Sequence, residues 1–486
     1  MYDYSTMYKQ LIIQKKSRYR AALAVLIFLL CFSLGTISSS ADTIDYNEES
    51  AKRKELPIQS NSTPSWPSGP AIGAEAAILM EAETGTILYA KNINEELYPA
   101  STTKIMTCLL AAENASLNDT ITFSHDAVFS VPSDGSSIGM DVGESITLEQ
   151  ALYGIMVGSA NEVANAVGEH VSGSIEAFVD LMNERAKELG CLNTHFNNTN
   201  GLQDENHYTS AYDLALIACK FFDNDLLCRI GNTPRYHFSP TATQPDDFYL
   251  NNKHKLITGE VKYSGIVGGK TGYTSLARET LVTCAEKNGM RLICVILKEE
   301  SPAQFSDTVT LFDYGFNNFR VVDPAEEDSR YMPSDNIFFE SENDVFGKSG
   351  TILNLHEGSS IVLPKTSKVS DTDYAISYDL SEKEKAETPT AIARVNYTFN
   401  GVPIGSSLIC YAPSSKQQTS ENTAAKSLFI NVKIVIAALG ILVILISIIG
   451  SISSHATVGR RYGSKNDRIR YNRRKKEYKR AKRHFK

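Results

Sequence analysis

The chain has 486 residues, which is enough for about three structural units. Apolar residues make up 42% and charged residues 21%, a balance that excludes a largely disordered chain. The net charge of the chain is −8, but the charge is unevenly distributed. Residues 453–486 carry 14 Lys or Arg and 2 Asp or Glu, and residues 1–41 carry 5 Lys or Arg and 1 Asp or Glu. The remaining residues, 42–452, therefore have a net charge of −24. The strongly negative charge of residues 42–452 argues against nucleic-acid binding, because a protein needs a basic surface to neutralise phosphates.

The N-terminal segment has the layout of a secretory signal peptide. Four cations within residues 15–20 precede a mostly apolar stretch over residues 21–37, and the small residues Ser39, Ser40 and Ala41 follow. This order is typical of a signal peptide that is cleaved, here after Ala41. An uncleaved signal anchor is the alternative. We therefore predict a signal peptide over residues 1–41.

Residues 42–319 are expected to form a linker followed by an α/β domain. Glu/Lys runs and then Ser-, Pro- and Gly-rich sequence predict a flexible linker over residues 42–72. Within residues 73–319, an early hairpin is expected at 76–80 and 85–89, and a late one at 279–285 and 291–297. Helical periodicity falls between them, over residues 101–114, 148–157, 161–170, 175–189 and 211–222. This order predicts an antiparallel sheet packed with helices.

The pattern changes after residue 319. Short alternating strands are expected over residues 360–363, 391–399 and 406–411, and Asn400-Gly401 is a turn signal between the last two. Residues 320–413 are therefore predicted to form a small all-β domain. The polar residues 414–433 are predicted to be a second linker.

The C-terminal region is expected to cross a membrane. Residues 434–452 are 19 residues of only Ile, Val, Leu, Ala, Gly and Ser. Such a helix spans about 30 Å, the thickness of a bilayer core. A buried globular helix is disfavoured because the basic tail, residues 453–486, follows at once. Positive residues stay on the cytoplasmic side, so we expect a single-pass protein of the bacterial cell membrane with its body outside and its tail inside, where the tail contacts anionic lipid.

A serine and a lysine at the start of one expected helix are candidates for nucleophilic catalysis. Ser101 and Lys104 are three residues apart, so they share a helix face, and the positive end of the helix dipole favours a developing oxyanion. Burial and a second cation would lower the pKa of Lys104, which could then act as a neutral base. The alternative is an N-cap serine followed by an exposed lysine.

Two further motifs add hydroxyl, amide and ammonium groups. Ser159 and Asn161 lie at a break between two expected helices, where a hydroxyl could relay a proton and an amide could bind a peptide group; ordinary helix capping is the alternative. Lys270, Thr271 and Gly272 follow a Gly-rich stretch, where small residues allow a substrate backbone to approach a strand and the first two offer donors to a carboxylate. A tight turn is the alternative there.

The joint occurrence of SxxK, SxN and KTG in this order is typical of penicillin-binding proteins and class A β-lactamases. Over roughly residues 74–413, the chain resembles the D-alanyl-D-alanine carboxypeptidases among the low-molecular-mass penicillin-binding proteins. The similarity includes the sequence around Ser101, residues 200–202, the segment beginning at Lys270 and, in the later β domain, residues 401–405. The resemblance implies a serine enzyme that acts on stem peptides ending in D-Ala-D-Ala and is inhibited by β-lactams. It implies no metal or organic cofactor.

The resemblance also implies roles for individual residues. Ser101 would be the acylated nucleophile and Lys104 its proton acceptor, with Ser159 and Lys270 relaying protons and Asn161 holding the substrate amide. On the strand that binds substrate, the implied residues are Thr271 for the terminal carboxylate, Gly272, and Tyr273, whose N–H would complete an oxyanion hole with that of Ser101.

Two departures from the family pattern concern the efficiency of the site. Glu162 follows Asn161 where an Asp is frequent, and Gln304 occupies the position of a frequent Arg. Asp204, His207 and Asp213 are interpreted as structural residues. Two other functions stay open at this point. One is a β-lactamase, which would need a deacylating carboxylate at a position that the sequence does not clearly provide. The other is a membrane-anchored wall-binding module with an inactive site.

Overall fold

A computed structural model describes residues 45–328, 330 and 353–411. Its largest sheet has five antiparallel strands in the order β2-β1-β9-β8-β7. The strands are β1 (Ala76–Glu81), β2 (Ile87–Lys91), β7 (Ile266–Thr274), β8 (Arg278–Lys287) and β9 (Met290–Glu299). Alternate residues of β1 enter two different cores: Ile78 packs with one and Leu79 with the other. The sheet is therefore covered on both faces, as the period of two in a strand requires.

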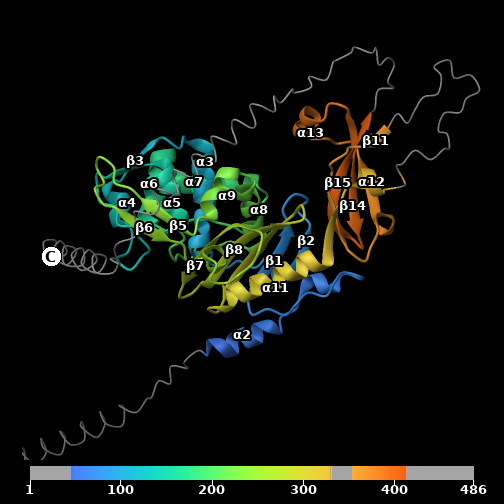
Figure 1. Ribbon diagram of the computed structural model, residues 1–486, viewed down its shortest axis with the longest axis horizontal. Helices are drawn as coiled ribbons and strands as arrows, with labels where there is room; N and C mark the ends of the chain where they lie inside the picture. Colours follow the sequence, from blue (N-terminus) through green and yellow to red (C-terminus); the bar gives the residue numbers. More distant parts are fainter. Residues whose placement is uncertain (1–44, 329, 331–352, 412–486) are drawn as a thin grey trace, which may run out of the picture. The chain divides into compact units, whose positions relative to one another are not determined.

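Most helices cover one face of this sheet, as Figure 1 shows. They are α3 (Lys104–Asn114), α4 (His125–Phe129), α5 (Leu148–Met156), α6 (Asn161–Ser172), α7 (Ile175–Glu188), α8 (Ala211–Phe222) and α9 (Asp225–Gly231), whereas α10 (Lys255–Thr258) packs with the core of the opposite face through Leu256. On the other face, α11 (Ala303–Asn318) packs through residues such as Phe312. Two small antiparallel two-stranded sheets complete this region: β3 (Thr120–Thr122) with β4 (Ser145–Thr147), and β5 (Arg235–Phe238) with β6 (Phe248–Asn251).

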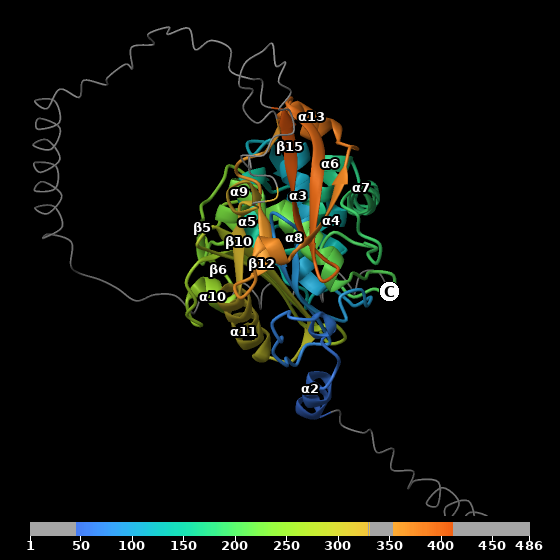
Figure 2. The same ribbon diagram turned by 90° about the vertical axis from the view of Figure 1, so that its right-hand side faces the viewer.

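A second sheet forms the later part of the described chain. Its six strands follow the order β10-β12-β15-β14-β13, with β11 paired to β15. They are β10 (Phe319–Val322), β11 (Leu353–Leu355), β12 (Ile361–Pro364), β13 (Asp373–Ser377), β14 (Ala391–Phe399) and β15 (Val402–Tyr411), drawn in orange shades in Figure 2 apart from β10. The short helices α12 (Pro324–Glu327), η3 (Val369–Asp371) and α13 (Glu382–Glu387) accompany them. Burial alternates along β14, which matches the expected half-buried strand.

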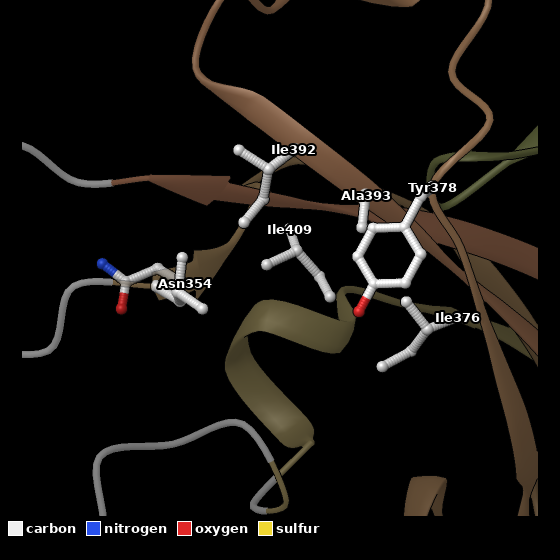
Figure 3. Close-up of a pocket in the computed structure, with 7 residues that line it drawn as sticks. Asn354, Ile376, Tyr378, Ile392, Ala393 and Ile409 are labelled. Carbon is white, nitrogen blue, oxygen red and sulfur yellow. The ribbon is translucent and has the colours of Figure 1, made fainter. Parts of the chain in front are cut away.

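One end of the second sheet carries a shallow apolar pocket. Figure 3 shows Ile376, Tyr378, Ile392 and Ile409 among the side chains that line it. Most of these side chains are aliphatic or aromatic, and Tyr378 is 79% exposed. The pocket lies in the β domain and is not lined by any of the residues expected to carry chemistry.

The described part of the first expected linker is ordered, so the prediction of a flexible linker is wrong there. Residues 45–72 contain the helix α2 (Tyr46–Lys54) and the short 3₁₀ helix η1 (Gln59–Ser62). Asp45 caps α2 by accepting from the N–H groups of Asn47 and Glu48. The polar composition of this segment did not reveal that two of its side chains, Trp66 and Ile72, are buried in the core beneath α11.

Trp66 joins the segment before β1 to both sheets. Its indole N–H donates to the Leu88 carbonyl at 2.9 Å, and its ring lies 5.0 Å from that of Phe319 and 6.1 Å from that of Phe399. Large aromatic side chains in such positions contribute most of the energy of a small interface.

We expect Trp66→Ala to lower the free energy of unfolding by about 3–5 kcal/mol, because it leaves a cavity among aromatic rings and removes one of the hydrogen bonds to the Leu88 carbonyl, which the Tyr314 hydroxyl also contacts. Urea unfolding of the variant measures this change. Leu192→Ala removes a side chain that is 87% exposed and should change the free energy by less than about 0.5 kcal/mol. Equal effects for the two variants would contradict the role of Trp66 as an anchor.

The expected signal peptide (residues 1–41), second linker (414–433), membrane helix (434–452) and basic tail (453–486) lie outside the described residues. Among the residues that are described, no helix combines the length and the apolar character needed to cross a bilayer.

Candidate active site

Ser101 and Lys104 meet where a 3₁₀ turn runs into α3. Ser101 lies in η2 (Ala100–Thr103), and Lys104 is the first residue of α3. The Lys104 Nζ is 3.1 Å from the Ser101 Oγ, and the Lys104 side chain is fully buried while Ser101 is partly exposed. The alternative of an exposed lysine is therefore excluded. The backbone of Ala100, just before the serine, has a φ of +49°, a strained conformation of the kind that concentrates at functional sites.

The other hydrogen bonds of Lys104 determine which way the lone pair of its amine points. Its Nζ donates to the Asn161 Oδ1 at 2.7 Å and to the Asn200 carbonyl at 2.5 Å. Both partners are oxygen atoms that can only accept hydrogen bonds, so a neutral amine would donate its two N–H groups to them. The remaining lone pair then faces the hydroxyl of Ser101, which is the geometry of a base that accepts the serine proton.

The electrostatic surroundings favour the neutral amine. Burial, followed by the positive charge of Lys270, holds the pKa of Lys104 well below its usual range. Glu162 acts in the opposite direction but does not outweigh these effects. The unprotonated amine that a general base requires is therefore more populated in Lys104 than in a free lysine.

Lys270 and Ser159 form a second buried pair. The Lys270 Nζ donates to the Ser159 Oγ at 3.0 Å and to the Thr271 carbonyl at 2.9 Å. Ser159 lies at the break between α5 and α6 with a φ of +57°, so it is not the ordinary helix cap of the alternative reading. Burial, followed by the charge of Lys253, lowers the pKa of Lys270 to about 7. Lys270 can therefore gain or lose a proton near neutral pH.

The strand that carries Lys270, Thr271, Gly272 and Tyr273 lies against the serine turn. A side chain at Gly272 would bring its Cβ within 2.8 Å of the Ser101 nitrogen and 2.3 Å of the Thr280 Oγ1, so only glycine allows this approach. The strand, β7, is at the edge of its sheet. An edge strand can pair with an extended peptide, and Tyr273, which is 56% exposed, stands at this edge.

Two asparagines that sequence reasoning did not assign support the base. Asn200 contributes its carbonyl to Lys104, and its side-chain Nδ2 donates to the Asn165 Oδ1 at 3.1 Å. The same Oδ1 accepts from the Thr199 Oγ1 at 2.6 Å. Asn165 follows Asn161 by four residues and so shares its helix face, a signal that could have identified it.

We expect Asn165→Ala to lower both stability and turnover. The variant leaves the Thr199 hydroxyl and the Asn200 amide without their acceptor, at a cost of about 1–3 kcal/mol. Thermal unfolding together with kcat measures both effects. Asn114→Ala, which removes an exposed amide at the end of α3, serves as the control. Wild-type stability and turnover in Asn165→Ala would contradict a supporting role.

The side chains of Glu162 and Gln304, the two departures from the family pattern, lie in different surroundings. The Glu162 Oε1 accepts from the Ser137 Oγ at 2.7 Å and from two backbone N–H groups, those of Ile138 and Gly139. The longer carboxylate therefore holds the loop beside Asn161. Gln304 is only 3% exposed in the first turn of α11, so its side chain is buried rather than presented to a substrate.

The three residues interpreted as structural make contacts typical of that role. The His207 Nδ1 accepts from the Asn197 N–H at 3.0 Å, so its Nε2 donates to the Thr103 Oγ1 at 2.8 Å. Burial lowers the pKa of His207 to about 3, which keeps the ring neutral. Asp213 accepts from the Asn193 N–H at 2.6 Å, and Asp204 accepts from that of Asn206 at 2.8 Å.

The chain is similar to known proteins over most of this region. A family model described as D-alanyl-D-alanine carboxypeptidase, Peptidase S11, matches residues 62–301. The carboxypeptidase DacF of Bacillus subtilis is 38% identical over 254 residues, which cover 51% of this chain and 63% of the relative. The carboxypeptidase DacB2 of Mycobacterium tuberculosis is 31% identical over 51% of this chain and 84% of its own. Penicillin binding protein 5 of Haemophilus influenzae has a similar structure, with a TM-score of 0.57 at 26% identity, covering 72% of this chain and 99% of that one.

Proposed function

Because this chain belongs to the family of D-alanyl-D-alanine carboxypeptidases, we propose that it removes the terminal D-alanine from peptidoglycan stem peptides through an acyl-enzyme on Ser101. The single observation that carries the proposal is the buried Lys104, which lies 3.1 Å from the Ser101 Oγ with its other two hydrogen bonds directed to carbonyl oxygens. The family match and the resemblance to penicillin-binding relatives support the same substrate and binding of β-lactams to the same serine.

In the acylation step, the Ser101 Oγ attacks the carbonyl carbon of the penultimate D-alanine while its proton moves to Lys104. The N–H groups of Ser101 and Tyr273 are proposed to bind the oxyanion, supported by the close approach of β7 to the serine turn. The C–N bond then breaks, and D-alanine leaves after its amine takes up a proton. Water hydrolyses the remaining ester and restores the serine.

The remaining site residues are proposed to bind the substrate and to carry the proton. The contact between Ser159 and Lys270 supports a path for the proton toward the leaving amine. Asn161 is proposed to hold the substrate amide, and Thr271 the terminal carboxylate, which the nearby Lys270 attracts while it is charged. Gly272 allows the peptide to lie along the edge of β7.

Release of D-alanine from a peptide ending in Lys-D-Ala-D-Ala tests this function. We expect release from this peptide and none from the same peptide ending in L-alanine, with slow turnover of penicillin. Fast penicillin turnover without peptide cleavage would instead indicate a β-lactamase. A folded protein that shows neither reaction would favour a wall-binding module.

We also propose that the enzyme is a single-pass protein of the bacterial cell membrane, with its catalytic domain outside and its tail inside. The apolar residues 434–452 and the 14 basic residues after residue 452 support this topology. Protease treatment of intact spheroplasts tests it, because we expect loss of the catalytic domain and protection of the tail. Protection of the whole chain would contradict the proposal.

A further inference from the structure

Helix α2 approaches the end of β7, where the expected substrate strand turns into β8. It lies on the side of the sheet that α11 covers (Figures 1 and 2). The family model begins at residue 62, so α2 (Tyr46–Lys54) lies outside the matched region. Its contacts are therefore a feature of this chain that the family match does not account for.

Arg278 is the point at which α2 meets the substrate strand. It is the first residue of β8 and pairs with Thr274 of β7. Its φ is +54°, a left-handed conformation that L-residues other than Asn and Asp rarely adopt. The surrounding contacts must hold the residue in place against this strain.

Three groups surround the guanidinium of Arg278. Its Nε and one terminal nitrogen donate to the Glu300 Oε2 at 3.0 and 2.5 Å. The ring of Tyr46, the first residue of α2, lies 3.8 Å from the guanidinium carbon. The other terminal nitrogen is 3.4 Å from the hydroxyl of Tyr273, at the open edge of the site. Arg278 is thus stacked on α2 and directed toward the substrate strand.

The other end of α2 is fixed to the same carboxylate. Arg53 is 6% exposed, and it donates to the Glu300 Oε1 at 2.9 Å and to the Gly73 carbonyl at 2.8 Å. The Lys91 Nζ donates to the Arg53 carbonyl at 2.6 Å. Glu300 therefore has an arginine on each side, one from α2 and one beside the active site. These contacts give α2 a defined position relative to Arg278.

We propose that Arg278 is a positioning residue for Tyr273 and that α2 holds it in place, so that an element outside the family core controls how tightly the substrate strand binds peptide. This inference rests on the proposed function. Arg278 contacts the hydroxyl of Tyr273 rather than the N–H that is proposed to bind the oxyanion, so its effect falls on KM rather than on kcat. The expected effect on KM is entropic. If the exposed Tyr273 side chain is already ordered before the substrate arrives, binding does not have to supply the conformational entropy lost in ordering it.

The test measures kcat and KM for D-alanine release, and the rate of Ser101 acylation by penicillin, in the full chain and in four variants. Tyr46→Ala removes the stacked ring, and Tyr46→Phe retains it. Arg278→Gly removes the guanidinium but suits the left-handed backbone, so the variant should fold. The fourth variant combines Tyr46→Ala with Arg278→Gly. Thermal unfolding of each variant confirms its fold.

We expect Tyr46→Ala and Arg278→Gly each to raise KM about tenfold with kcat unchanged within about twofold. Tyr46→Phe should match the wild-type chain, and the double variant should be no worse than Arg278→Gly, because Tyr46 acts through Arg278. An unchanged KM in either single variant, additive effects in the double variant, or a fall in kcat alone would overturn the inference while leaving the proposed function intact. A wild-type chain that neither releases D-alanine nor binds penicillin would overturn both.

Discussion

Ser101→Ala should lose both D-alanine release and covalent labelling by penicillin while it keeps its fold. We expect kcat to fall on the order of 10⁴- to 10⁶-fold, because removing the nucleophile of a serine enzyme leaves only the contribution of the oxyanion donors and substrate binding. Ser101 is partly exposed, and its hydroxyl is hydrogen-bonded to Lys104, so stability should change little. Release of D-alanine under saturating peptide, together with fluorescent penicillin labelling, measures the loss.

A matched control separates chemistry from helix capping. Ser174→Ala also removes a serine at a helix start, where the Ser174 Oγ accepts from the Ala177 N–H at 3.1 Å. It should cost about 1 kcal/mol of stability and leave turnover unchanged. If Ser101→Ala retained more than about 1% of wild-type release, which is far above the residual rate expected without a nucleophile, another residue would have to be acylated.

Lys104→Arg should lower the rate of acylation about 10²- to 10⁴-fold even though it places a positive charge at the same position. A guanidinium cannot be deprotonated in a protein, so it cannot accept the Ser101 proton. If the lysine acted only as a charge, the variant would retain most of its activity. The rate of penicillin acylation measures the difference, with Lys220→Arg as a control on the exposed surface of α8.

The pH dependence of acylation follows from the same lysines. Because burial holds the pKa of Lys104 well below its usual range, the neutral amine persists to lower pH than in a free lysine, and the acylation rate should fall on acidification, as the amine takes up a proton. The pKa of Lys270 is about 7, so the charge that attracts the peptide carboxylate should disappear above that pH and KM should rise. A profile for kcat/KM that is flat from pH 5 to 9 would contradict both assignments.

The sequence predicted the parts of the site that depend on local spacing. Ser101 and Lys104 meet because residues three apart share a helical face, and α8 and β14 occupy the ranges that their periodicity indicated. The structure brings the three motifs together, because Lys104 contacts Asn161 and Lys270 contacts Ser159 across 111 positions of sequence.

Contacts made by the backbone or by distant polar residues could not be predicted. The Asn200 carbonyl reaches Lys104 across 96 positions, and backbone acceptors carry no signal in residue identity. The order of residues 45–72 depends on Trp66 and Arg53, whose buried partners lie in β2 and at the end of β9. Composition reports only the polar residues around them, so it indicated a linker. Arg278 has a left-handed backbone conformation, which glycine usually occupies, so an arginine at this position gives no sequence signal of that conformation.

The residue to which a β-lactam attaches is the most direct test of Ser101 as the nucleophile. The measurement is mass spectrometry of the penicillin-treated chain after proteolysis, which locates the adduct by residue. We predict one penicillin per chain, on the peptide that contains Ser101, and none in Ser101→Ala. An adduct on any other residue, or an unmodified Ser101 peptide in folded protein, would contradict the assignment of Ser101 and Lys104 as nucleophile and base.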